Sequence, residues 1–240
     1  MTATITTIPA LTVETADLDA VTVDIYRDVH KGIRNELFAV TFATGRVDPA
    51  DVAAIGAVGA RWRTLAGLLV SHAQHEDDFV QPLIETHAPA FADRIAREHP
   101  QLEAQMAALE LLADRAASSC PQDRRSLVHR LYLGLASFTA AYLQHQEFEE
   151  LHVMPALAAR IGAQELRDLD NAIVASIPPD ELAQSGSFMI PAMNVEDRVE
   201  LLGEIQAHAP ADAFAGITAL VEALLDADEF RAVATRLGVG

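Results

Sequence analysis

Residues 72–82 have the sequence HAQHEDDFVQP, and residues 145–155 have the sequence HQEFEELHVMP. The two stretches are identical at four pairs of positions: His72 and His145, Glu76 and Glu149, Val80 and Val153, Pro82 and Pro155. In each stretch a histidine precedes a glutamate by four residues, a spacing that places both side chains on one face of a helix. The recurrence after 73 residues predicts two similar helical halves.

Apolar residues recur at intervals of three and four along four segments, two of which contain these stretches. Such spacing forms one apolar stripe on each helix, which is buried against neighbouring helices. We expect helices at roughly 18–43, 49–86, 91–117 and 122–160, with ends uncertain by about 2–4 residues. Because the connections are short, the sequence predicts an all-α fold, an up-down-up-down four-helix bundle.

Turn residues and prolines mark the expected helix ends. Asp48-Pro49 and Cys120-Pro121 each predict a capping residue followed by a proline at the first helical position. Breaks are expected at Thr44-Gly45 and at His87-Ala88-Pro89. Pro100 directly follows His99, so the third helix either bends there or begins later than residue 91.

The stripes of the second and fourth helices are expected to continue past the glutamates without a change of register. In the second helix the stripe proceeds from Glu76 to Phe79 and Leu83. In the fourth it proceeds from Glu149 to His152, which makes His152 a candidate for an additional buried ligand.

The composition supports an all-helical protein with one main core. Half of the 240 residues are hydrophobic but only 5% are aromatic, and alanine and leucine, both strong helix formers, are frequent. We expect the bundle to occupy residues 18–160 and a C-terminal helical extension to occupy residues 161–240. Pro178-Pro179 and Ser185-Gly186-Ser187 mark a linker in this extension. Its helices either pack on the bundle or mediate self-association.

Charge and cysteine content exclude several classes of function. The formal net charge of −18 disfavours nucleic acid and anionic lipid as partners. Cys120 is the single cysteine, so neither an intramolecular disulfide nor a cysteine metal cluster is expected. Residues 1–20 lack the pattern of a secretory signal, and no apolar run approaches the ~20 residues needed to cross a bilayer. We therefore expect a cytoplasmic protein.

The stripes carry ionisable residues that point to bound metal. His30 and His99 lie on the first and third stripes, and the two HxxxE pairs lie on the second and fourth. A carboxylate in an apolar seam is unfavourable unless it is paired or bound to a cation. Imidazole and carboxylate ligands without thiolates suit iron, manganese, zinc or copper. Since zinc prefers closed four-coordinate sites, a dinuclear site with open positions favours iron.

The order His, HxxxE, His, HxxxE, with a proline after each HxxxE, resembles the haemerythrin-like (HHE cation-binding) domain family over roughly residues 18–160. The resemblance implies a pair of iron ions bridged by carboxylates and an oxo or hydroxo group. It also implies which residues hold them. The terminal ligands would be His30, His72, His99 and His145, and the bridging ligands would be Glu76 and Glu149.

The sequence departs from the oxygen carriers of this family at one ligand. These carriers have a fifth histidine four residues after the one on the third helix, where this chain has Glu103. The resemblance therefore implies binding and turnover of hydrogen peroxide, O2 or nitric oxide, as in a catalase-like or nitric-oxide-handling di-iron oxidoreductase, rather than oxygen carriage. The alternative is an oxygen or iron sensor that signals through its C-terminal helices without turnover.

Several further residues are candidates for the site or its surroundings. The sequence leaves open whether Glu103, His152 or a tyrosine, Tyr26 or Tyr142, completes the metal site, and it favours a position of His75 outside the ligand set. A ferritin-like site is disfavoured because its second ExxH motif is missing from the second helix. A metal-free scaffold is disfavoured by six ionisable groups in one apolar seam.

Overall fold

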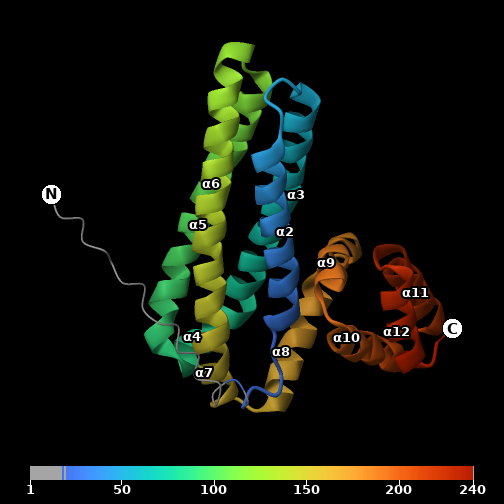
Figure 1. The fold of residues 1–240 in the computed structure, drawn as a ribbon. Coiled ribbons are helices and arrows are strands. Elements are labelled where there is room, and N and C mark those ends of the chain that lie inside the picture. The colour runs from blue at the N-terminus through green and yellow to red at the C-terminus, as the bar shows by residue number, and fades with distance from the viewer. Residues whose placement is uncertain (1–17, 19, 240) are drawn as a thin grey trace, which may run out of the picture.

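The computed structural model describes residues 18 and 20–239, and the described part of the chain is helical without strands. Four long helical segments lie side by side (Figure 1). The first is α2 (Arg27–Arg46) and the third is α5 (Pro89–Ser118). The second comprises α3 (Val52–His75), the π-helical turn η1 (Glu76–Val80) and α4 (Gln81–His87). The fourth comprises α6 (Pro121–Phe148), the π-helical turn η2 (Glu149–Val153) and α7 (Met154–Ala158).

Short polar side chains fix where two of these helices begin. The Asp24 carboxylate accepts hydrogen bonds from the backbone amides of Tyr26 and Arg27, so α2 begins at Arg27 rather than at the predicted residue 18. Asp51 caps α3 by accepting from the Ala54 amide at 2.9 Å, so Pro49 precedes the helix instead of opening it. The first two predicted starts were therefore too early.

The proline signals at the other two starts were accurate. Pro121 is the first residue of α6, as predicted, and α5 begins at Pro89. Because α5 begins well before Pro100, this proline lies inside the helix. Of the two expectations for the third helix, the one that places a proline within it is correct.

The π-helical turns change the register that the sequence predicted. Each wide turn contains more residues than an α-helical turn, so the buried positions after it move along by one residue. After Glu76 the buried residues are Val80 and Ile84, not Phe79 and Leu83. After Glu149 the stripe continues at Val153, and His152 is exposed. The expectation of an unbroken register was wrong at both turns.

Two apolar clusters fill the space between the long helices. Trp62 and Phe138 meet edge to face in the larger cluster, with ring centroids 5.2 Å apart. The second cluster lies toward the other end and is built from side chains such as Ile84 and Leu157. On every long helix, the predicted metal ligands fall between a residue of one cluster and a residue of the other. The flanking pairs are Tyr26 and Ile33, Leu69 and Val80, Ile95 and Leu102, and Tyr142 and Val153. A polar layer therefore separates two apolar regions.

The C-terminal extension forms five further helices. They are α8 (Ala163–Ser176), α9 (Pro179–Ala192), α10 (Val195–His208), α11 (Ala211–Leu224) and α12 (Ala227–Leu237). The predicted linker at Ser185-Gly186-Ser187 is instead part of α9. Pro178 is the N-cap residue of this helix and Pro179 is its first residue. The negative charge of Asp180 in the first turn interacts favourably with the helix dipole, so the helix is stable at this position.

The extension packs on α2 (Figure 1). A Cβ atom on Gly32 would lie 3.0 Å from the Met189 Cα atom, so only glycine allows the backbones of α2 and α9 to come this close. Lys31 forms an ion pair with Asp197 of α10. Among the described residues, no helix is long and apolar enough to span a membrane.

The close contact at Gly32 generates a test of the packing. Gly32→Ala is expected to lower the free energy of unfolding by about 1 kcal/mol, because the new methyl group must displace the backbone of α9. The matched control is Gly56→Ala in α3, where no atom lies within 4 Å of the added Cβ. This change should raise the free energy of unfolding by about 0.5–1 kcal/mol through helix propensity. Chemical denaturation measures both values, and equal stabilisation by the two changes would contradict the observed contact.

Candidate metal centre

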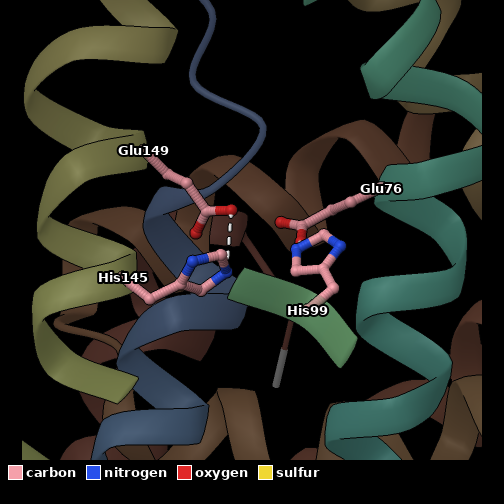
Figure 2. A group of neighbouring side chains, drawn as sticks. All are labelled: Glu76, His99, His145 and Glu149. Atoms are coloured by element: carbon pink, nitrogen blue, oxygen red, sulfur yellow. Dashed lines mark ion pairs between the residues drawn. The ribbon is translucent and has the colours of Figure 1, made fainter. Parts of the chain in front are cut away.

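The six predicted ligands come together in the polar layer between the apolar clusters. Figure 2 shows four of them, Glu76, His99, His145 and Glu149, directed toward one another from three segments of the chain. The other two, His30 from α2 and His72 from α3, adjoin this group. All six are largely buried, and His72, the most accessible, has 10% of its side chain exposed.

Each glutamate lies between two imidazoles from different helices. Glu76 Oε1 is 3.2 Å from His72 Nε2, and Glu76 Oε2 is 3.3 Å from His99 Nε2. Glu149 repeats the arrangement, with Oε1 3.1 Å from His145 Nε2 and Oε2 3.5 Å from His30 Nε2. The Nε2 atoms of His30 and His72 are 3.2 Å apart. All four imidazoles thus direct Nε2 toward the carboxylates.

Donor atoms converge in two overlapping groups that could each hold a metal ion. In the first group, Glu76, His99, His145 and Glu149 each offer an atom within 4.8 Å of the others. The second group consists of His30, His72 and Glu76. Because Glu76 belongs to both groups, its carboxylate lies where it could contact two ions.

The protonation equilibria show how strongly burial and neighbouring charges act on this layer. Burial lowers the pKa of His72 to about 4. Burial would raise the pKa of Glu76, but His72 and His99 outweigh it and lower that pKa to about 2. Burial, assisted by the charge of Glu76, raises the pKa of Glu149. The negative charge of Glu76 thus disfavours ionisation of Glu149.

The residues present fit a bound cation. The four carboxylate oxygens of Glu76 and Glu149 are buried without a hydrogen-bond partner in the described structure, and the same is true of His99 Nε2. Buried unpaired carboxylate oxygens are strongly unfavourable, whereas carboxylate and imidazole together are a suitable donor set for divalent metals. Cations between these groups would satisfy the oxygens that the protein leaves unpaired.

Three of the four imidazoles donate their outer N–H group to a further carboxylate. His99 Nδ1 donates to Asp77 at 2.7 Å, and His145 Nδ1 donates to Glu98 at 2.9 Å. His30 Nδ1 donates to Glu150 at 2.9 Å. A carboxylate at Nδ1 fixes the tautomer and ring orientation, so that Nε2 keeps its lone pair for a metal.

Arginines hold two of these outer carboxylates in place. Arg34 binds both oxygens of Glu150, at 2.7 and 2.8 Å. Arg94 Nε donates to Glu98 at 2.7 Å, and its guanidinium lies 3.7 Å from the centre of the Phe148 ring. Burial would raise the pKa of Glu150, but its hydrogen bonds to His30 and Arg34 lower that pKa to about 2. Glu150 therefore accepts from both groups as a carboxylate.

The specific role of these outer carboxylates escaped the sequence reasoning. Asp77 and Glu150 directly follow Glu76 and Glu149 and are themselves 73 residues apart, so the repeated motif is HxxxE followed by an acid. This signal was available in the repeat. Glu98 has no counterpart in the repeat, and its contact with His145 depends on the packing of α5 against α6.

The remaining candidates do not join the donor groups. Glu103 and His152, whose part in the metal site the sequence left open, are exposed and lie outside both donor groups. His152 instead lies beside Phe148, with ring centroids 5.1 Å apart. His75 is partly exposed and lies beside Phe79 rather than in the donor groups.

The two tyrosines are buried against histidines of the predicted ligand set. The Tyr26 ring stacks on the His30 ring at a centroid distance of 5.0 Å. The Tyr142 ring meets the His145 ring edge to face at 5.7 Å. Burial raises the pKa of both phenols well above its usual value, with the charges of Glu149 and Glu76 adding to the effect. Both tyrosines pack as neutral rings that limit the movement of the imidazoles.

The outer carboxylates generate a prediction for metal affinity. Glu98→Ala removes the acceptor at His145 Nδ1 and is expected to weaken metal binding about 10–100-fold while the six inner side chains remain. Glu103→Ala, an exposed change on the same helix, is the matched control and should leave affinity unchanged. Competition against a chelator of known affinity measures both. Equal affinities of the two variants would show that Glu98 does not support the site.

Comparison with known proteins agrees with the geometry. The family model described as "Hemerythrin HHE cation binding domain" matches residues 21–171, which is more than half of the chain. No curated protein and no solved structure gives a match. The resemblance inferred from the order of histidine and HxxxE motifs is thereby confirmed, and the chain belongs to the hemerythrin HHE cation-binding domain family.

Proposed function

We propose that this chain is a non-haem di-iron protein built on an up-down-up-down four-helix bundle. His30 and His72 would hold one iron and His99 and His145 the other. Glu76 and Glu149 would bridge the irons together with an oxo or hydroxo group. The observation that carries this proposal is a set of four buried carboxylate oxygens that lie among four imidazole Nε2 atoms and have no hydrogen-bond partner in the described structure.

Iron is the preferred metal because of the donor chemistry and the family. The donor set contains imidazole and carboxylate without thiolate, which suits iron, and carboxylates shared between two positions suit a dinuclear site. The matched family binds cations. When bound, two irons would supply Lewis acidity, open coordination positions and the ability to exchange electrons.

We propose hydrogen peroxide, O2 or nitric oxide as the molecules that this centre binds and turns over. Disproportionation of peroxide is the reaction to test first, because two H2O2 yield O2 and two H2O without any other oxidant or reductant. The protein supplies a buried site and fixed imidazole orientations. Asp77, Glu98 and Glu150 keep the Nδ1 protons of three histidines in place.

A sensor without turnover is the second candidate, and a specific contact favours it. The C-terminal helices touch α2 directly beside His30, through the ion pair of Lys31 with Asp197 and the backbone contact of Gly32 with Met189. A change at His30 on metal or ligand binding would therefore act on the packing of α9 and α10. In this alternative, occupancy would be reported by the extension, or by its self-association.

The test of both candidates starts from metal content. The purified protein, loaded with ferrous iron without air, is expected to contain two irons per chain by elemental analysis. Addition of peroxide should change its absorption and release oxygen at a rate far above that of free iron. Glu76→Ala removes the carboxylate that belongs to both donor groups and should lose most of the iron.

The outcomes separate the candidates. Two irons with oxygen release support the oxidoreductase, whereas two irons without turnover favour the sensor. The absence of stoichiometric iron after anaerobic loading would rule out the di-iron proposal. Glu103→Ala serves as the folded control for Glu76→Ala, because Glu103 is an exposed glutamate outside both donor groups.

A further inference from the structure

Gln146 is a buried polar residue that neither the packing nor the proposed metal ligation explains. Its side chain is fully buried, and neither its amide oxygen nor its amide nitrogen has a hydrogen-bond partner in the described structure. An unpaired amide in a protein interior is unfavourable, so such a group is normally satisfied by protein or by ordered water. Gln146 directly follows the proposed ligand His145 in α6.

The pairing of α2 with α6 shows where Gln146 lies. His30 contacts Glu150 at one point of this interface, and Thr41 contacts Thr139 at another. The second contact is eleven residues further along α2 and eleven residues back along the chain from Glu150, which lies in η2, so α2 and the fourth helical segment are antiparallel. Arg34 lies four residues after His30, and Gln146 lies four residues before Glu150. The antiparallel pairing therefore places Gln146 at the level of Arg34.

These residues form a polar seam within an otherwise apolar interface. We define the α2–α6 seam as His30 and Arg34, which both bind Glu150, the pair Thr41 and Thr139, and the buried Gln146. The seam reaches the metal centre at His30, whose Nε2 faces Glu149. A polar molecule within the seam would therefore lie among polar side chains beside the buried donors.

A surface groove lies directly over the seam. Its volume is about 360 Å³, and it is lined by Arg34, Leu143, Gln144, Glu147, Glu150 and Leu151. Leu143 of α6 and Glu150 of η2 lie three residues before and four residues after Gln146, a spacing that places them on its side of the helical segment. The paired side chains of Arg34 and Glu150 therefore separate the groove from both Gln146 and His30.

We propose that Gln146 binds a molecule of the water and hydrogen peroxide class within the α2–α6 seam, and that peroxide reaches the metal centre by this route. The amide oxygen accepts a hydrogen bond and the amide nitrogen donates one, so a single small molecule that satisfies both atoms must be able to donate and to accept. Water and hydrogen peroxide meet this requirement, whereas O2 and nitric oxide have no hydrogen to donate. The seam thus selects peroxide among the molecules named in the proposed function, on which this inference rests.

The test removes the amide while keeping the length of the side chain. Gln146→Met is compared with wild type and with Gln105→Met, an exposed glutamine on α5 away from the seam. In iron-loaded protein, the second-order rate constant for reaction with hydrogen peroxide should fall about tenfold in Gln146→Met, as expected for loss of a buried hydrogen-bond partner. The rate of oxidation of the ferrous protein by O2 should stay within about twofold of wild type in both variants. An unchanged peroxide rate, or an equal loss of both rates, would overturn the role of Gln146.

A second measurement is independent of turnover. A crystal structure of the wild-type protein should show a water molecule within hydrogen-bonding distance of the Gln146 amide, and the Gln146→Met structure should lack it. A dry wild-type interface would overturn the proposal. If the wild-type protein binds no iron, the proposed function fails, while this measurement still decides whether Gln146 binds a molecule of this class. Gln146→Leu replaces Gln146→Met if the latter does not fold.

Discussion

Two carboxylates held between four imidazoles, in a layer with apolar clusters on either side, are the constraint to which the rest of this structure responds. Glu76 and Glu149 each lie within 3.5 Å of two Nε2 atoms, and their oxygens have no hydrogen-bond partner in the described structure. Such a layer is unfavourable without cations. The outer carboxylates, the arginines and the buried tyrosine rings all hold the imidazoles where cations would need them.

Two π-helical turns determine the backbone conformation at the buried glutamates. Both begin at the inward-facing glutamate, at Glu76 and at Glu149, and both end in a buried valine. A π-helical turn is rare compared with an α-helical turn and is frequently found at functional sites. The same irregularity in both halves of the chain, at the same place in the repeat, indicates that the site rather than local propensity determines the backbone there.

The sequence predicted the chemistry of the inner layer better than the geometry around it. Spacing by three, four and 73 residues identified all six inner side chains, because helical periodicity and a repeated motif are local properties. His152 was misplaced because a π-helical turn leaves no mark in the periodicity before it. The role of Glu98 depends on how α5 packs against α6, which spacing along one helix cannot express. Gln146 belongs to no motif in the sequence, and only burial without a hydrogen-bond partner distinguishes it.

The internal repeat is preserved in the predicted ligands but not in the residues that hydrogen-bond to them. Asp77 and Glu150 occupy equivalent places in the two halves, and each accepts the Nδ1 proton of a histidine on a helix other than its own. His145 donates its Nδ1 proton to Glu98, whereas its counterpart His72 makes no Nδ1 hydrogen bond among the described residues. A carboxylate at Nδ1 increases the basicity of a ligating imidazole. The pair His99 and His145 therefore offers the stronger donors, so the two halves of the site are chemically unequal although their sequence motif is the same.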